Sequence, residues 1–179
     1  MNKFAIACLL AGGLILSACG ANEALAEEKS PAVTVKIINS KGANIGTAQL
    51  SQIGDHVQIV IEAQNLPPGP HGTHFHAAGR CDPPDFTTAE AHLNPQHRQH
   101  GFENAKGFHA GDLPNIEVSA DGKVRANITT KTVTLEKGKP NSLLRPGGTS
   151  LIIHEKADDY ITDATGNSGD RIACAAITE

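Results

Sequence analysis

Alternation of apolar and polar residues, with a period of two, constrains the fold of this chain more than any other feature. It runs over residues 33–37, 57–63 and 124–128. Strands of an antiparallel sheet alternate in this way because successive side chains point to opposite faces and one face is buried. The spacing typical of an amphipathic helix is poorly represented. The pattern therefore predicts an all-β protein.

Shorter apolar segments between turn-forming residues extend the prediction of strands along the rest of the chain. We expect strands at 33–37, 44–50, 57–63, 73–77, 115–118, 124–128, 150–155 and 171–178. Turn-forming residues separate several of them, at 67–70, 121–122 and 146–148. About eight short antiparallel strands without helices are typical of an eight-stranded Greek-key barrel or sandwich.

A long segment interrupts the alternation. Residues 78–113 contain glycine, proline, asparagine and four histidines but no strand pattern. Loops longer than about 15 residues within a compact domain are usually functional or disordered. We expect this one to be a metal-binding loop that a metal and a disulfide keep ordered. A second irregular stretch, 156–170, precedes the last expected strand.

The N-terminus carries the signature of export. An apolar run over residues 4–16 is shorter than the roughly 20 residues of a membrane-spanning helix but suits a signal peptide. It ends in Leu16-Ser17-Ala18-Cys19, which resembles the lipobox of bacterial lipoproteins, where the cysteine is lipidated and becomes the mature N-terminus. A general secretory signal with an incidental cysteine is the alternative.

The chain therefore divides into three predicted parts. Residues 1–18 are a lipoprotein signal peptide, residues 19–31 a lipidated Cys19 with a flexible tether, and residues 32–179 the domain. The expected location is a bacterial membrane, at its extracytoplasmic face or in the periplasm, with membrane lipid attached through Cys19.

Export narrows the roles of the four cysteines. Cys8 leaves with the signal peptide, and Cys19 carries the lipid. Cys81 and Cys174 remain in an oxidising compartment, where they are the obvious disulfide pair.

Charge and aromatic content argue against nucleic acid as a partner. The chain has 15 Lys and Arg against 19 Asp and Glu, it lacks tryptophan, and aromatic residues make up 3% of it. Nucleic-acid binding uses a basic face and aromatic platforms. Histidine, by contrast, is unusually frequent, with nine in the chain. Because histidine is the commonest metal ligand, this frequency points to a metal rather than to nucleic acid.

Several histidines stand in positions that suit a metal. His74 and His76 are two residues apart in an expected strand, so both rings point to one face. By itself such a pair is more often two exposed strand histidines. The other members of the set are His92, His100, His109, Asp112 and His154.

The set as a whole resembles the copper/zinc superoxide dismutase family. The most specific segments are 71–76, 91–95, 100–101, 109–115, 154–159 and 166–174. The resemblance covers about residues 33–178. It implies an eight-stranded Greek-key barrel or sandwich, which agrees with the strands expected from alternation.

The resemblance implies two metal sites that share one ligand. Copper, one ion per subunit, is expected on His74, His76, His92 and His154. Zinc, one ion per subunit, is expected on His92, His100, His109 and Asp112. The shared His92 then bridges the two ions as an imidazolate. Imidazole suits both metals, and one carboxylate completes a closed tetrahedral zinc site.

Other matched residues surround these ligands. By resemblance, Asp158 links a copper-site imidazole to a zinc-site imidazole, and Arg171 stands beside the copper to attract and dock the anion. His71 matches a non-ligand histidine that braces loops. His56 and His97 match nothing in the family and are expected at the surface.

The implied activity converts two superoxides and two protons into oxygen and hydrogen peroxide while copper cycles between Cu(II) and Cu(I). By resemblance, the bridging imidazole of His92 leaves reduced copper and takes up a proton for the second superoxide. The chain retains all four copper ligands, which favours catalysis. The oligomeric state stays open, a homodimer included.

One departure from the family concerns charge. Residues 156–170 carry one lysine and four aspartates, so the basic residues that steer superoxide in that loop are not visible. Superoxide is an anion, so the protein must attract it locally. Either Arg171 is helped by a basic residue of the long loop, which contains Arg80, Arg98 and Lys106, or the steering of superoxide is weak.

Two other functions remain as hypotheses. A non-catalytic, zinc-stabilised copper-binding or copper-buffering lipoprotein on the same fold would explain the missing basic charges. A zinc hydrolase fits poorly, because His154-Glu155 is not part of a His-Glu-x-x-His motif and a closed zinc site leaves no position for water.

Overall fold

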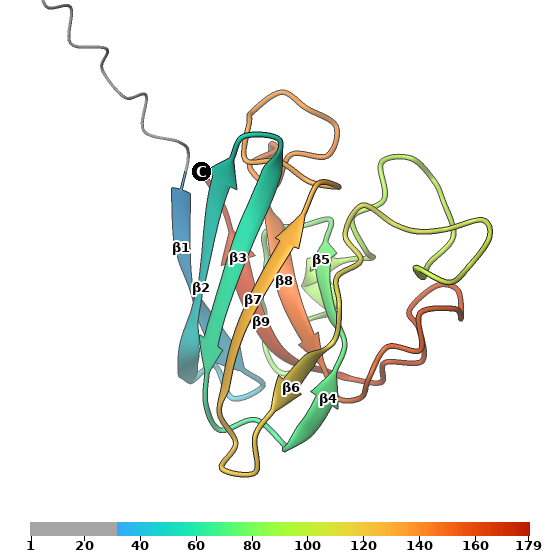
Figure 1. Ribbon diagram of the computed structural model, residues 1–179. Coiled ribbons are helices and arrows are strands. Elements are labelled where there is room, and N and C mark those ends of the chain that lie inside the picture. Colours follow the sequence, from blue (N-terminus) through green and yellow to red (C-terminus); the bar gives the residue numbers. More distant parts are fainter. Residues whose placement is uncertain (1–31) are drawn as a thin grey trace, which may run out of the picture.

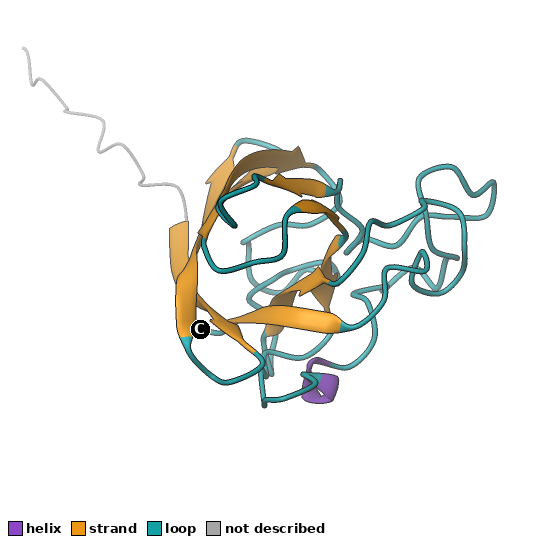
Figure 2. Cartoon of the chain, turned by 90° about the horizontal axis from the view of Figure 1, so that it is seen from below, coloured by secondary structure: helices purple, strands orange, loops and turns teal. Residues whose placement is uncertain are grey.

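Nine antiparallel strands make up the fold in the computed structural model, which describes residues 32–179 (Figure 1). They are β1 (Ala32–Asn39), β2 (Asn44–Ile53), β3 (His56–Ala63), β4 (Gly69–His71), β5 (Thr73–His76), β6 (Ile116–Val118), β7 (Val124–Thr130), β8 (Thr149–His154) and β9 (Arg171–Ile177). Seven strands form one sheet in the order β5-β8-β9-β1-β2-β3-β7, and β4 pairs with β6. Figure 2 shows the sheet curling around a common interior.

The antiparallel all-β fold is confirmed, with nine strands where about eight were expected. The additional strand is β4, which lies partly within the predicted turn at 67–70. Its residues Gly69 and Pro70 pair with Val118 and Glu117 of β6, far away in the sequence. Local turn preferences do not reveal such a partner, and a short edge strand tolerates proline.

Alternating side chains fill the interior of the curled sheet. The odd-numbered residues of β3, from Val57 to Ala63, are buried, whereas the residues between them are partly or fully exposed. Leu50 of β2 and Leu151 of β8 enter the same core. The period-two pattern therefore identified which face of these strands points inward.

Strand β8 differs because it is buried on both faces. All six of its residues are buried, and Ile152 packs with Phe86 and Ala89 of the long loop in a second apolar cluster. A strand covered on both sides has a continuous apolar run rather than alternation. The loop that follows β5 supplies this cover.

The predicted disulfide between Cys81 and Cys174 is confirmed. It joins residues 93 positions apart, with their Cα atoms 5.7 Å from each other, and ties the long loop to β9. The predicted signal peptide and tether, Cys8 and Cys19 lie outside the described residues. Within residues 32–179, no helix is long and apolar enough to cross a membrane.

Candidate metal centre

The long loop runs along the free edge of β5 and brings its own side chains beside those of the strand. The Phe75 N–H donates to the Gly111 carbonyl, and the Leu93 N–H donates to the Phe75 carbonyl, both at 2.8 Å. A Cβ at Gly111 would collide with the Phe75 carbonyl, so glycine permits this close approach. As a result His92 lies opposite His76, and Asp112 lies opposite His74.

His154 reaches the same place from the neighbouring strand β8. The pairing of β8 with β9 shifts register between Ile153 and His154, where His154 pairs with Arg171. Bulges of this kind turn a side chain in a new direction and are frequent next to active sites. Strands β5 and β8 are hydrogen-bonded neighbours, so the three strand histidines share one buried region.

Four histidines converge on one point of this region. They offer ring nitrogens that all lie within 4.8 Å of one another, and all four residues are buried: His74, His76, His92 and His154. Their nitrogens Nδ1 of His74 and Nε2 of the other three have no hydrogen-bond partner among the described residues. Buried polar atoms are nearly always satisfied. Four orphaned nitrogens that face one point therefore fit a metal ion.

The opposite nitrogens of three of these rings are held by the protein. His76 Nδ1 donates to the Glu90 carbonyl at 2.8 Å, and His154 Nδ1 lies 3.3 Å from the Gly169 carbonyl. His74 Nε2 lies 2.9 Å from an oxygen of Asp158. Such bonds fix the orientation of each ring toward the common point.

A second set gathers around the carboxylate of Asp112. Its Oδ1 lies 3.2 Å from His92 Nδ1, 3.0 Å from His100 Nδ1 and 3.4 Å from His109 Nδ1. His92 Nδ1 and His109 Nδ1 are 3.3 Å apart. A tetrahedral zinc site with bonds of about 2.0–2.1 Å separates its ligand atoms by about 3.3 Å. The spacing fits a closed four-ligand zinc site.

His92 belongs to both sets through its two nitrogens. Its Nε2 faces the first set and its Nδ1 the second. His74 also lies within 4.8 Å of His92, His100 and Asp112. However, its Nε2 is bound to Asp158, so His109 is the better fourth member of the second set. The structure thus brings together every residue that the sequence predicted as a metal ligand.

Burial keeps the rings of His92 and His154 in the neutral form that binds metal. It lowers the pKa of both His92 and His154 to about 3. Burial acts on His100 in the same direction, but hydrogen bonds with Asp112 and Asp158 outweigh it and raise the pKa of that ring to about 9. Metal binds the neutral imidazole. His92 and His154 therefore hold a free lone pair at neutral pH, and His100 releases a proton when metal binds.

Asp158 connects the two sets. Its Oδ2 lies 2.9 Å from His74 Nε2, and its Oδ1 lies 3.0 Å from His100 Nε2. Burial by itself would raise the pKa of Asp158, but the bonds from His100 and His74 lower it well below its usual range. The ionised carboxylate accepts a hydrogen bond from each ring, as the sequence predicted.

Arg171 is partly exposed at the start of β9, where it pairs with His154 of β8. Its Nη1 donates to the Phe86 carbonyl and its Nη2 to the Glu90 carbonyl, each at 2.7 Å. The same Glu90 carbonyl accepts the bond from His76 Nδ1. A single peptide group therefore joins the arginine to a histidine of the first set. The sequence did not reveal this link, because every residue carries a backbone carbonyl and no residue type marks the one that accepts these bonds.

Glu90 itself has a backbone conformation typical of glycine. Its φ is 66° and its ψ is −156°, and a non-glycine residue in this region costs about 1–3 kcal/mol. Glu90→Gly is expected to raise the free energy of unfolding by about 1 kcal/mol, because glycine removes the strain but gives the unfolded chain more freedom. Denaturant titration would measure the change.

The matched control for this prediction is Glu90→Gln, which removes the charge and keeps the strain. It should unfold at the same denaturant concentration as the natural chain. Equal unfolding midpoints for Glu90→Gly and Glu90→Gln would contradict the strain interpretation.

The remaining histidines lie where the sequence placed them. The ring nitrogens of His71 face the carbonyls of His154 at 2.7 Å and of Pro67 at 2.8 Å, so this side chain braces two loops. His97 is exposed, and the partly exposed His56 contacts the neighbouring Asp55. Neither His56 nor His97 belongs to the metal-ligand groups found among the described residues.

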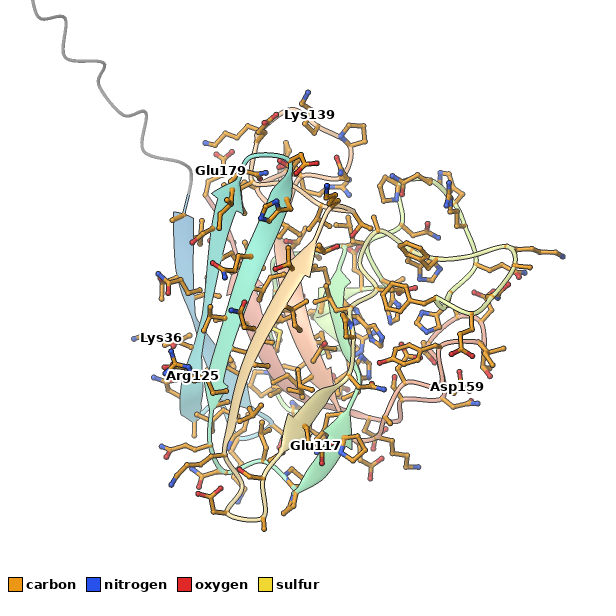
Figure 3. The ribbon with its side chains drawn as sticks, viewed as in Figure 1. Lys36, Glu117, Arg125, Lys139, Asp159 and Glu179 are labelled. Carbon is orange, nitrogen blue, oxygen red and sulfur yellow. A yellow bond between two sulfur atoms is a disulfide. The ribbon has the colours of Figure 1, made fainter. Side chains whose placement is uncertain are left out.

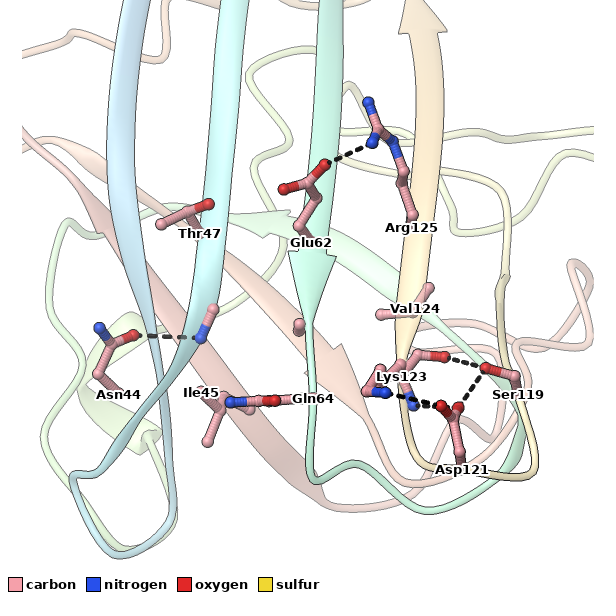
Figure 4. Close-up of a pocket in the computed structure, with 12 residues that line it drawn as sticks. Asn44, Ile45, Thr47, Glu62, Gln64, Ser119, Asp121, Lys123, Val124 and Arg125 are labelled. Carbon is pink, nitrogen blue, oxygen red and sulfur yellow. Dashed lines mark hydrogen bonds and ion pairs between the residues drawn. The ribbon is translucent and has the colours of Figure 1, made fainter.

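A large hollow lies away from these histidines. Its volume is about 710 Å³, and it is lined by residues at the adjoining ends of β2, β3 and β7 (Figure 4). Two exposed ion pairs line it, Glu62 with Arg125 at 3.2 Å and Asp121 with Lys123 at 3.0 Å. Its lining contains no histidine or cysteine. The hollow is therefore separate from the metal centre.

Comparison with known protein families agrees with this geometry. The model of the family described as copper/zinc superoxide dismutase (SODC) matches residues 44–177. Superoxide dismutase (Cu-Zn) 1 of Aquifex aeolicus is 49% identical over 142 residues, which cover 79% of this chain and 84% of that protein. Superoxide dismutase (Cu-Zn) 2 of the same organism is 41% identical over 170 residues, 94% of this chain and 96% of the relative.

Solved structures show the same similarity. The crystal structure of a superoxide dismutase-like protein from Bacillus subtilis superposes with a TM-score of 0.78 at 42% identity, over 80% of this chain and 97% of that one. The Cu/Zn superoxide dismutase from Brucella abortus gives a TM-score of 0.67 at 26% identity, over 82% of this chain and 99% of that one.

Proposed function

The chain belongs to the copper/zinc superoxide dismutase family, and we propose from this premise that its histidine centre converts superoxide into oxygen and hydrogen peroxide. One observation carries the proposal. Four buried ring nitrogens, which have no hydrogen-bond partner in the described part of the chain, converge beside a compact set of three histidines and one aspartate. His92 is common to both groups.

The proposal assigns a metal to each set. Copper binds His74, His76, His92 and His154, and zinc binds His92, His100, His109 and Asp112. Bound copper would supply the one-electron redox chemistry that the disproportionation of superoxide requires. Four protein ligands close the zinc site, which suits a structural role.

The side chains of the protein supply the proton and hold the anion. His92 Nε2, which has no partner among residues 32–179, can carry a proton while His92 Nδ1 stays with the zinc ligands. Arg171 is partly exposed, and two of its N–H groups bind carbonyls. Its remaining N–H groups and its permanent charge suit a small anion.

Metal analysis of the purified domain, together with a dismutation assay, tests the function. The expected result is one copper and one zinc per chain and rapid removal of superoxide. A domain that binds copper and zinc fully but removes superoxide no faster than free buffer would contradict the proposal. It would favour the non-catalytic, copper-buffering alternative, which the acidic loop at 156–170 supports.

Asp158→Asn is expected to weaken binding of both metals about 10- to 100-fold, the usual effect of losing a residue that orients metal ligands. The amide nitrogen would face a ring N–H of either His74 or His100, which leaves one ring without an acceptor. Competition with a chelator would measure both affinities.

Asp159→Asn provides the matched control for this variant. Asp159 is adjacent in sequence and exposed, and its carboxylate binds only within its own loop, to groups of Ile161, Thr162 and Asn167. Its metal affinities should stay at the natural level. Equal affinities for Asp158→Asn and Asp159→Asn would exclude an orienting role for Asp158.

We also propose that Cys19 carries lipid and holds the enzyme at a bacterial membrane. The support is the Leu16-Ser17-Ala18-Cys19 sequence after an apolar run. Mass spectrometry of the membrane fraction should find the mature N-terminus at Cys19 with attached acyl chains. Cys19→Ser should release the protein into the soluble fraction, and continued membrane attachment of this variant would contradict lipidation.

A further inference from the structure

Three aromatic side chains, Phe102, Phe108 and Tyr160, pack together outside both metal-ligand sets. The ring centroids of Phe102 and Phe108 are 4.8 Å apart with an angle of 62° between the ring planes, and those of Phe102 and Tyr160 are 5.6 Å apart. Aromatic pairs at these separations attract each other. Figure 3 shows Asp159, the neighbour of Tyr160 in the sequence, on the side of the molecule opposite Lys36 of β1. We call these three rings the aromatic cluster.

The aromatic cluster is not part of the barrel core. Its three residues belong to neither of the two buried apolar clusters. Phe102 keeps 40% of its surface exposed, whereas the core residue Phe75 is fully buried. The hydrophobic effect scales with the apolar area that is removed from water. Removal of the Phe102 ring should therefore leave the barrel folded.

The two phenylalanines join the ends of one loop segment, residues 100–109. Phe102 is two residues after His100, and Phe108 directly precedes His109. Both histidines belong to the second metal-ligand set. The contact between the two phenylalanine rings therefore opposes any movement that separates His100 from His109.

Tyr160 fastens this segment to the loop that follows β8. Its carbonyl accepts a hydrogen bond from the Glu103 N–H at 2.9 Å, and its hydroxyl accepts one from the Asn115 N–H at 2.7 Å. A Cβ at Gly101 would collide with the same carbonyl, so glycine permits the close approach of the two loops. The ring that packs on Phe102 is thus held both at its backbone and at its hydroxyl.

Resting on the proposed zinc site, we infer that the aromatic cluster retains the zinc ion by keeping the loop segment 100–109 closed. Zinc leaves when its ligands move apart, and the ring contacts oppose the movement of His100 away from His109. Phenylalanine offers no ligand atom, so Phe102 and Phe108 are positioning residues that act through the backbone of the segment.

Phe102→Ala is the most informative variant, because Phe102 takes part in both ring contacts. Each contact is worth about 2- to 10-fold in an equilibrium constant, so the loss of both is expected to speed zinc release about ten-fold. Phe102→Tyr keeps the ring, and the exposed position accommodates an added hydroxyl. This conservative variant should release zinc within about two-fold of the natural rate.

Ile53→Ala is the matched control, because it also removes an exposed apolar side chain. Ile53 keeps 45% of its surface exposed and is the last residue of β2, at the turn to β3. It belongs to neither the aromatic cluster nor the segment 100–109. Its zinc release should equal that of the natural chain.

Two measurements test the inference. Stopped-flow transfer of zinc from the metal-loaded chain to a chelating dye gives the rate of zinc release. Amide hydrogen exchange of the metal-free chain reports the opening of the segment in the absence of any metal. The Gly101 and His109 N–H groups both donate to Asp112 Oδ2 at 3.0 Å, so their exchange accelerates when the segment opens. The amides of β3 report a general loosening of the barrel.

The inference is supported if Phe102→Ala releases zinc about ten-fold faster, Phe102→Tyr restores the natural rate, and the Gly101 and His109 amides exchange faster while those of β3 do not. It is overturned if Phe102→Ala releases zinc as slowly as Ile53→Ala, or if the β3 amides accelerate as much as the two amides of the segment. Faster zinc release from Phe102→Ala, with a natural chain that does not remove superoxide, would reject the proposed function but keep this inference. A natural chain that binds no zinc would overturn the zinc assignment and this inference together.

Discussion

His154→Ala is expected to abolish superoxide dismutation while zinc stays bound. His154 belongs only to the first set, the proposed copper ligands. It does not contact the carboxylate of Asp112, around which the second set, the proposed zinc ligands, gathers. Loss of a residue that merely orients a ligand costs about 10- to 100-fold, and loss of a ligand costs more, so we expect activity to fall at least about 100-fold. Metal analysis and the dismutation assay on the same sample measure both effects.

His97→Ala is the control for this variant, because His97 is exposed and outside both ligand sets. It should keep full activity and both metals. Substantial activity in His154→Ala, with copper retained, would show that the copper assignment is wrong. Loss of zinc together with copper would show instead that the two sites do not fold independently.

Removal of the disulfide is expected to lower stability strongly. In the chain-entropy model, a cross-link that closes a loop of 93 residues contributes about 4–5 kcal/mol. At about 2–4 °C per kcal/mol for a domain of this size, the Cys81→Ala/Cys174→Ala variant should melt about 10–20 °C lower. Thermal unfolding of the metal-free proteins measures the shift, because bound metal would add its own stabilisation.

The same variant should also lose activity, for a local reason. The disulfide holds the loop segment that contains Phe86 and Glu90, whose carbonyls bind Arg171. Reduction of the natural disulfide should reproduce both effects in the unchanged sequence. A melting temperature within about 2 °C of the natural protein would contradict the stabilising role.

Much of the fold was predictable from alternation, and the exceptions have identifiable causes. The strands at 57–63 and 124–128 follow the pattern because one face of each is buried. Strand β4 escaped prediction because Gly69 and Pro70 are turn residues whose strand conformation depends on pairing with β6. Pairing between distant segments leaves no local signal in the sequence.

The ligand sets were predictable to the residue, whereas their supports were not. The assignment of each histidine and of Asp112 to a set came from the resemblance to the copper/zinc superoxide dismutase family. The Glu90 and Gly169 carbonyls that orient His76 and His154 belong to the backbone, so no residue type marks them. The positive φ of Glu90 could not be predicted either, because residues other than glycine rarely adopt this backbone conformation.

By itself the sequence determined which cysteines pair and which strand faces are buried, because these properties follow from side-chain chemistry and periodicity. Through its family resemblance it also picked out the histidines and the aspartate that the structure brings together. Only the tertiary structure decided how charge is arranged around Arg171. Asp85 and Asp170 are far apart along the chain, and they meet beside Arg171 because the disulfide-bonded loop folds against the start of β9. Electrostatic repulsion depends on distance in space, which the folded chain alone defines.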